Sequence, residues 1–315
     1  MTTLAVVVLL FALLVCGLVG YTAYTARQVE RAVPPRGRFL QLDGCRIHYI
    51  DEGAGPPLFL VHGLSGNLRN FAYVIPHLSA GYRVIAVDRP GSGYSTRAAT
   101  ADARLAAQGD TLARVIQALK LERPLVVGHS LGGAIALALG LDHPDCVSGL
   151  ALIAPLTQVV ETPAPFRGLD IKSPLLRSII AWTLAIPVGM RTADQALKDV
   201  FAPEKPSPDF MTRGGGALGL RPRSFYAASA DLRAAHDSLG EVVRRYPSLT
   251  VPVGILFGKS DAILEPGLNG KTTKDQIPGL SLQLIEGGHV LPVTQPDAVA
   301  GFIRRMAVAA TAQAP

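Results

Sequence analysis

Short apolar runs alternate with longer segments of helical spacing along most of the chain. The runs cover residues 57–61, 82–87, 125–127, 147–154, 251–258 and 282–286. Runs of this length and composition are typical of parallel strands that are covered on both faces. Between two of them, Leu105, Leu112 and Ile116 have the spacing of a helix that packs on a sheet. This alternation predicts an α/β fold.

Three further segments depart from the alternation. Residues 39–50 alternate apolar and polar positions around Asp43-Gly44, which predicts an antiparallel hairpin at the edge of the sheet. Residues 156–240 contain apolar helical stretches and a Gly run, and they show no strand pattern. Residues 296–308 predict a closing helix.

The N-terminus carries the longest apolar run of the chain. Residues 4–20 contain no charged residue, and with residues 21–24 added a helix would cross about 30 Å of hydrocarbon. A secretory signal peptide is the alternative. It would need a basic start, a shorter apolar core and an A-x-A-like cleavage site, which this sequence lacks. We therefore expect residues 1–26 to form an uncleaved, single-pass transmembrane anchor.

Four arginines follow this run: Arg27, Arg31, Arg36 and Arg38. By the positive-inside rule they place the domain that follows on the cytoplasmic side. In the alternative interpretation they only contact anionic headgroups, and the side stays open. Residues 27–37, which include Pro34-Pro35, are predicted to link the anchor to the domain.

Composition and charge limit the classes of partner that the protein is expected to bind. The chain has 315 residues, of which 49% are hydrophobic and 17% charged, with a net charge of +6. The basic residues are scattered without interleaved aromatic residues, so we expect no nucleic-acid partner and favour a membrane surface. Cys16, Cys45 and Cys146 are predicted to be buried free thiols. No metal-ligand spacing occurs, and we expect neither a metal nor a cofactor. The sequence predicts no oligomeric state.

The most informative stretch is Gly128-His129-Ser130-Leu131-Gly132, which follows a predicted strand and opens a predicted helix. A turn from strand to helix in so few residues crowds the backbone, and glycines remove the side chains that would clash. The serine hydroxyl is then held at a helix N-terminus, where free N–H groups can stabilise an anion. The alternative is a Gly-rich turn with a helix-capping serine.

At these residues the chain resembles the α/β-hydrolase fold family, over about residues 38–306. The resemblance implies a mostly parallel eight-stranded sheet with helices on both faces and a helical cap inserted after the sixth strand. The core would then comprise residues 38–155 and 241–310, and the cap residues 156–240. Six apolar cap residues could line a substrate site or form the cap's own core: Ile179, Ile180, Trp182, Leu184, Ile186 and Met190.

Two loops match segments of the same family. By resemblance, the loop His62-Gly63-Leu64 supplies one oxyanion donor, the N–H of Leu64, and the N–H of Leu131 supplies the other. His62 itself is predicted to orient the loop. The segment 88–95 has the pattern D-x-P-G-x-G-x-S, and we interpret its Asp88 and Ser92 as loop-stabilising residues.

Ser130, Asp261 and His289 each follow a predicted strand and occur in the chain order of the family. Because parallel strands end at the same edge of a sheet, the three side chains are expected to meet there as a catalytic triad. His143 is the other candidate base. It lies about 20 Å from Ser130 along the intervening helix, which excludes it.

A serine at this position predicts acyl transfer to water, with an ester, thioester, lactone or amide as substrate. Relatives that cleave carbon–carbon bonds or act as cofactor-free peroxidases also use serine, and a catalytically silent binding module is a further alternative. The apolar cap and the anchor favour a small-molecule ester that is hydrophobic or lipid-like.

Overall fold

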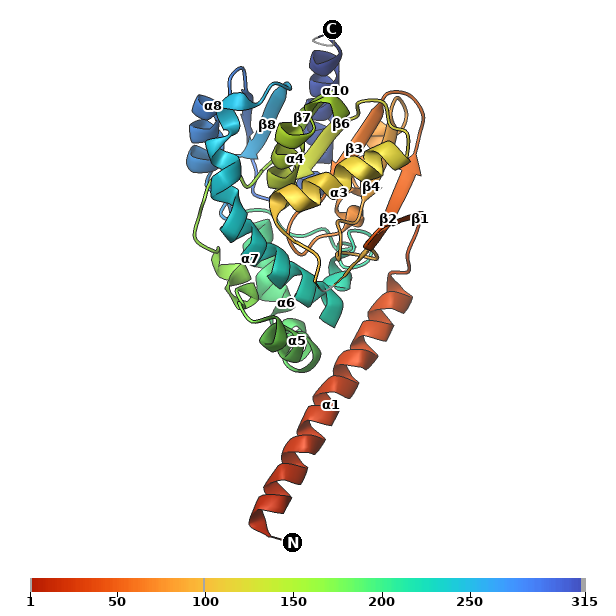
Figure 1. The fold of residues 1–315 in the computed structure, drawn as a ribbon, viewed down its shortest axis with the longest axis vertical. Helices are drawn as coiled ribbons and strands as arrows, with labels where there is room; N and C mark the ends of the chain where they lie inside the picture. The colour runs from red at the N-terminus through yellow and green to blue at the C-terminus, as the bar shows by residue number, and fades with distance from the viewer. Residues whose placement is uncertain (1, 99, 313–315) are drawn as a thin grey trace.

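Nine strands among the described residues form one sheet in the domain that follows the long N-terminal helix α1 (Thr3–Ala32) (Figure 1). This computed structural model describes residues 2–98 and 100–312. The main path of the sheet has the order β1-β2-β4-β3-β6-β7-β8-β9. Its strands are β1 (Arg38–Leu42), β2 (Cys45–Glu52), β3 (Pro57–Val61), β4 (Arg83–Val87), β6 (Leu125–His129), β7 (Gly149–Ile153), β8 (Val253–Gly258) and β9 (Ser281–Ile285).

The sheet is antiparallel at one edge and parallel elsewhere. β2 pairs antiparallel with both β1 and β4, and the remaining pairs on the main path are parallel. The predicted α/β fold with a mostly parallel sheet and an edge hairpin is confirmed. The additional strand β5 (Thr96–Arg97) pairs with β2. It is absent from the sequence-based prediction because two residues are too few to show a period.

Helices cover both faces of the sheet, as predicted. One apolar cluster joins the sheet to α3 (Leu105–Ala118) and α4 (Leu131–Asp142), and a second joins it to α2 (Ile75–Leu78) and α10 (Pro296–Ala312). Residues 131–140 of α4 are buried on every side, since this helix lies between the sheet and α3. Two short helices, α8 (Thr273–Gln276) and α9 (Leu291–Thr294), flank β9.

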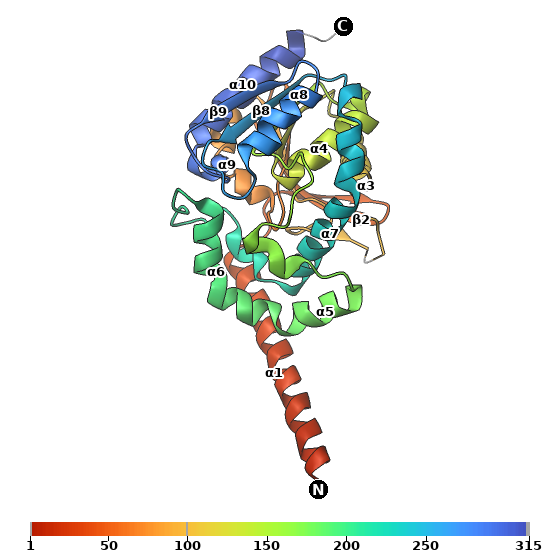
Figure 2. The ribbon, with the colours of Figure 1, turned by 90° about the vertical axis from the view of Figure 1, so that its left-hand side faces the viewer.

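The segment between β7 and β8 contains three longer helices, α5 (Pro174–Thr183), α6 (Ala185–Phe201) and α7 (Pro222–Arg244). α5 and α6 lie at the end of the domain from which α1 projects (Figure 2). α7 runs from there to the main body and packs on α3 and α4. It therefore passes the boundary at residue 240 that the sequence suggested for the cap.

Helix α1 continues to Ala32, six residues into the segment expected to be a linker. Val29 and Val33 explain this extension, because both are buried against Tyr94 and Leu218 of the domain. α1 is also the one helix in the described part of the chain that is long and apolar enough to cross a membrane.

The positions of the six apolar cap residues agree neither with a lining of the substrate site nor with a core of the cap. Trp182, Leu184 and Met190 are 45%, 52% and 47% exposed, and Ile179 is 51% exposed. Of the six, Ile186 alone is buried and Ile180 is partly buried. The four exposed side chains therefore neither line a cavity nor form a cap core, because α5 and α6 pack on α7 and α1 through other residues.

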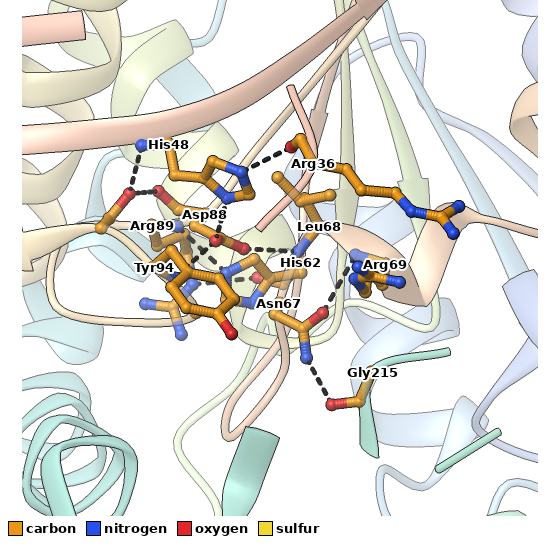
Figure 3. A network of polar contacts seen from close by, with 12 residues as sticks. Arg36, His48, His62, Asn67, Leu68, Arg69, Asp88, Arg89, Tyr94 and Gly215 are labelled. Carbon is orange, nitrogen blue, oxygen red and sulfur yellow. Dashed lines mark hydrogen bonds and ion pairs between the residues drawn. The ribbon is translucent and has the colours of Figure 1, made fainter. Parts of the chain in front are cut away.

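Asp88, directly after β4, links the segments that follow β3 and β4 to strand β2 (Figure 3). One carboxylate oxygen accepts the N–H of Leu68 at 2.8 Å, and the other accepts the N–H of Tyr94 at 2.7 Å. The second oxygen also lies 2.7 Å from Nδ1 of His48, whose Nε2 is 2.6 Å from the carbonyl oxygen of Arg36. The predicted loop-stabilising role of Asp88 is confirmed.

His62 and Arg89 form the adjacent part of this network (Figure 3). Nδ1 of His62 donates to the carbonyl of Gly63 at 2.8 Å, and Nε2 accepts the N–H of Arg89 at 3.0 Å. The predicted role of His62 in orienting the loop is therefore confirmed. Burial and the positive charge of Arg89 lower the pKa of His62 to about 3, so the ring is neutral near pH 7.

The Arg89 side chain is fully buried and joins the loop after β3 to helices α3 and α7. It donates to the carbonyl oxygens of His62 and Gly63 at 3.0 Å, and to Gln108 of α3 and Asp231 of α7 at 2.7 Å. Asp231 also accepts from Arg97 at 2.8 Å, so this buried carboxylate pairs with two guanidinium groups. A buried charge is tolerated when it is paired and hydrogen-bonded in this way.

We predict that His62 reduces stability in acid. Its folded pKa of about 3 lies below the ordinary value of 6.5, so between these values the unfolded chain binds more protons. The free energy of unfolding should fall as the pH drops through this window, by up to about 1.4 kcal/mol per pH unit from this residue. His62→Gln should flatten the slope in urea unfolding of the detergent-solubilised full chain, followed by circular dichroism.

Leu58→Ala is the matched control for this experiment, because it removes buried apolar contacts without removing a titratable group. It should lower stability by about 2–4 kcal/mol at every pH and leave the slope as in the wild type. Equal slopes for His62→Gln and the wild type would contradict the assignment.

Candidate active site

Ser130 stands on a strained turn between β6 and α4. Its backbone has φ 54° and ψ −123°, a conformation that costs a non-glycine residue about 1–3 kcal/mol. A Cβ at Gly132 would lie 2.2 Å from the carbonyl oxygen of Val61, and one at Gly128 would lie 2.7 Å from the Cα of Gly133. The glycines of the motif are thus required by the close approach of the backbone, as the sequence predicted.

The structure brings Ser130, His289 and Asp261 together at the carboxyl edge of β6, β8 and β9. Nε2 of His289 lies 3.0 Å from Oγ of Ser130, and Nδ1 lies 2.8 Å from Oδ2 of Asp261. The Asp261 side chain is fully buried, and its other oxygen accepts the N–H groups of Ile263 and Leu264 at 2.9 Å. Asp261 therefore holds the Nδ1–H tautomer of His289, which leaves Nε2 free to accept the serine proton.

The residues of the two expected oxyanion donors both lie near Ser130. Leu64 and Leu131 both line a cavity that contains the serine. Among the described residues, neither backbone N–H has a protein acceptor. A Cβ at Gly63 would lie 2.9 Å from the Cβ of Ser130, so the loop before Leu64 approaches the serine directly. Both N–H groups are thus available near the hydroxyl.

Two residues that sequence reasoning missed hold the loop of His289. Nε2 of His129 donates to the carbonyl of His289 at 3.0 Å, and burial together with the neighbouring His289 lowers the pKa of His129 to about 3. Glu204, from the segment after α6, accepts the N–H of Gly288 at 2.9 Å. His129 occupies a variable position of the motif, and Glu204 lies far from it in sequence, so no local signal marks either residue.

The other residues that the sequence analysis considered lie away from Ser130. His143 is at the far end of α4 and bonds Asp110 at 2.7 Å. Cys45 is buried as predicted, whereas Cys146 is partly exposed and Cys16 is exposed on α1. Within residues 2–98 and 100–312, no group of three or more His, Cys, Asp or Glu side chains is arranged to hold a metal ion.

Two cavities meet at Ser130. The first has an empty volume of about 590 Å³, including the part open to solvent, and its wall contains Leu156, Val160, Phe166, Leu232, Leu239 and Ile263. The second, of about 940 Å³, contains His289 and is lined from the other side by Asn67, Leu197, Val200, Phe201 and Phe210. The serine hydroxyl can therefore contact a molecule that extends in two directions.

Comparison with known proteins agrees with this architecture. The family model of the alpha/beta hydrolase fold matches residues 56–296. An acetyltransferase component of the acetoin cleaving system of Pseudomonas putida is 34% identical over 284 residues, which is 86% of this chain and 69% of that protein. A 2-hydroxymuconate semialdehyde hydrolase of a Pseudomonas species is 40% identical over 123 residues, 38% of this chain and 44% of that one.

Among solved structures, a membrane phospholipase A described as a bacterial virulence factor superposes with a TM-score of 0.69 at 24% identity. The match covers 98% of this chain and 96% of that one. The family model covers most of the chain, and the strand order and the glycine-lined turn at Ser130 agree with it. The chain therefore belongs to the alpha/beta hydrolase fold family.

Proposed function

We propose that this protein is a membrane-anchored serine hydrolase that cleaves a carboxylic ester with an apolar acyl group through an acyl-enzyme intermediate. The observation that carries the proposal is the hydrogen-bonded line Asp261–His289–Ser130, which ends at the junction of two cavities. A nucleophile, a base and a group that orients the base are the components that acyl transfer requires.

In the proposed first step, Nε2 of His289 takes the proton of Ser130, and Oγ attacks the ester carbonyl carbon. The N–H groups of Leu64 and Leu131 stabilise the resulting oxyanion, and each donor contributes about 3–4 kcal/mol to the transition state. His289 then gives its proton to the leaving alcohol. Water repeats the sequence on the acyl-enzyme and releases the acid.

The position of His289 orients the substrate. Because His289 protonates the leaving alcohol, the alcohol must depart on the side of Ser130 that this residue occupies. His289 lines the second cavity and is not among the residues that line the first. We therefore assign the acyl group to the first cavity and the alcohol to the second.

The packing of α1 supports an anchor that is retained. Thr22, Thr25 and Val29 are buried on α1, and Glu30 pairs with the buried Arg221 at 3.3 Å. Removing the helix as a leader would expose the surface that these residues cover. The arginines that follow the apolar run support a cytoplasmic location for the domain, as proposed from the sequence.

Carbon–carbon bond hydrolysis is the second candidate function, and a specific observation favours it. The partial relative at 40% identity is a 2-hydroxymuconate semialdehyde hydrolase. The apolar wall of the first cavity favours the ester, because an apolar acyl chain gains more from burial there than a charged substrate does.

We predict that a fluorophosphonate probe labels Ser130. Ser130→Ala should remove labelling and lower kcat for p-nitrophenyl esters by about 10⁴-fold or more, because nucleophile and base act as one unit. His289→Ala should have a comparable effect. Mass spectrometry of the labelled peptide locates the modified residue, and His143→Ala is the matched control that should keep wild-type labelling.

A wild-type protein that takes up no probe would contradict the enzyme proposal and favour a binding module. Labelling without ester hydrolysis, together with turnover of a 2-hydroxymuconate-type substrate, would favour carbon–carbon bond cleavage instead.

We predict that the two cavities separate acyl from alcohol selectivity, and two matched variants test this. Val160 lines the first cavity and Val200 the second, and both side chains are partly buried. Val160→Trp should lower kcat/KM for octanoyl relative to acetyl esters by about tenfold or more, since it fills the acyl site. Val200→Trp should instead reduce activity on esters of bulky alcohols.

Deacylation distinguishes the two variants further, because the alcohol has left before that step. Val160→Trp should change the deacylation rate measured after the burst phase, and Val200→Trp should leave it unchanged. The reverse pattern would show that the two cavities have been assigned the wrong way round.

A further inference from the structure

Helices α5 and α6 expose large apolar side chains to the surroundings of the domain. These are Leu175, Leu176, Ile179, Trp182, Leu184, Val188 and Met190, each between 45% and 71% exposed. We call these seven residues the apolar face of α5 and α6. The single ionisable residue within residues 174–190 is Arg177, which is buried and donates to Ser229 Oγ at 2.9 Å and to the carbonyl of Ile171 at 2.8 Å. Scattered apolar side chains are common on soluble proteins, but a grouped set of this size marks an interaction surface.

The neighbour of this face is the membrane-spanning candidate itself. α5 and α6 both pack on α1, and the two views show them beside its domain-proximal half (Figures 1 and 2). The covered positions of α1 follow one side of the helix: Val15, Leu18, Val19, Thr22, Ala23, Thr25, Ala26, Val29 and Glu30. Their spacing of three and four residues is that of one helix face in contact with a partner.

The length of α1 fixes the depth of this contact. The apolar stretch runs from Leu4 to Tyr24, and about 20 helical residues are needed to cross the hydrocarbon. If the covered part from Val15 onward stood in water, residues 4–14 would reach only about 16 Å, roughly half of the required thickness. A spanning α1 therefore brings whatever packs on residues 15–24 to the level of the bilayer.

The residues that border the face suit a membrane interface. Tyr21 and Tyr24 of α1 are 45% and 61% exposed, and Trp182 is 45% exposed. Such aromatic side chains favour the headgroup level. The exposed cations Lys172 and Arg191 flank the face at its two ends, where they can meet lipid phosphates.

We propose that the apolar face of α5 and α6 is seated in the lipid bilayer beside α1, on the side where the domain lies. Its occupant is the acyl-chain and headgroup region of the bilayer. The inner side of α6 carries Leu197, Val200 and Phe201, which line the second cavity at Ser130. Val188 and Met190 lie about two turns or more before Leu197, so α6 runs from the proposed lipid contact to the second cavity. If the proposed function holds, a lipid ester reaches Ser130 along this helix without crossing water.

Trp182 is the single tryptophan of the chain, so the native protein reports on this face by itself. The full chain is reconstituted in vesicles of phosphatidylcholine and phosphatidylglycerol, and at one chain per disc in lipid nanodiscs. Phosphatidylcholine brominated on its acyl chains should quench Trp182 fluorescence in both preparations, and aqueous acrylamide should quench it weakly. Quenching by acrylamide without an effect of the brominated lipid would overturn the proposal.

The quenching experiment distinguishes two further outcomes. Protection from both quenchers would mean that protein covers the face, as in contact with a second copy, and would also overturn the proposal. The variant Trp182→Phe/Leu9→Trp places the reporter on α1 alone. If that reporter is quenched by brominated lipid and Trp182 is not, α1 spans the bilayer and the inference about α5 and α6 fails by itself.

Activity gives an independent test that rests on the proposed function. Ile179→Asn/Leu184→Asn should lower hydrolysis of diacylglycerol embedded in vesicles by about tenfold or more, and should change soluble p-nitrophenyl butyrate hydrolysis by less than about twofold. Val308→Asn, at an exposed apolar residue of α10, is the matched control and should change neither rate. Equal loss on both substrates would contradict a membrane role, whereas a wild type inactive on both would contradict the proposed function and leave the quenching result to stand.

Discussion

A close backbone contact between the turn at Ser130 and the loop that follows β3 sets the geometry on which the rest of the site depends. Gly132 faces the carbonyl oxygens of Val61 and His62 at distances that leave no room for a Cβ. Gly63 faces the side chain of Ser130 in the same way. This contact places the N–H groups of Leu64 and Leu131 beside one hydroxyl. The strain at Ser130 is tolerated because β6 and α4 are buried on all sides.

The loops at this edge are held by buried polar groups rather than by apolar packing alone. Asp88 accepts backbone N–H groups from the segments after β3 and β4, and Arg89 donates to carbonyl oxygens of the same segment after β3. His129 and Glu204 hold the segment that carries His289. Asp88, Arg89 and His129 each have hydrogen-bond partners that offset the cost of burial, whereas Oε1 of Glu204 has no partner among the described residues. Ser130, Asp261 and His289 are thus positioned by a scaffold that includes residues of the inserted segment.

The sequence predicts those features that arise from local patterns. Each of these features leaves a signal within a few residues. They are the short apolar strands, the glycine-flanked serine between a strand and a helix, and the Asp and the His that follow later strands. Parallel strand order then brings Ser130, Asp261 and His289 to one edge, and the structure agrees. The loop roles of His62 and Asp88 also follow from their turn chemistry.

Long-range pairings leave no such signal, which is why the remainder could not be predicted. Nothing near Asp231 indicates that it neutralises Arg89, from which it is separated by 142 positions. The amphipathic pattern of α5 and α6 shows that one face is apolar, but not whether that face turns toward a cavity, a core or lipid. The direction depends on how these helices pack on α1 and α7, and this packing is a property of the whole fold.

The carboxylate of Asp231 gives the inserted segment a role in the stability of the sheet-forming part of the chain. It belongs to α7, yet it neutralises two guanidinium groups of the sheet-forming part of the chain, and one of these, Arg89, is fully buried. If the inserted segment were replaced by one that lacks this carboxylate, the buried guanidinium group of Arg89 would lose its ionic partner. The inserted segment therefore cannot be exchanged as a whole without an acidic residue at this one position.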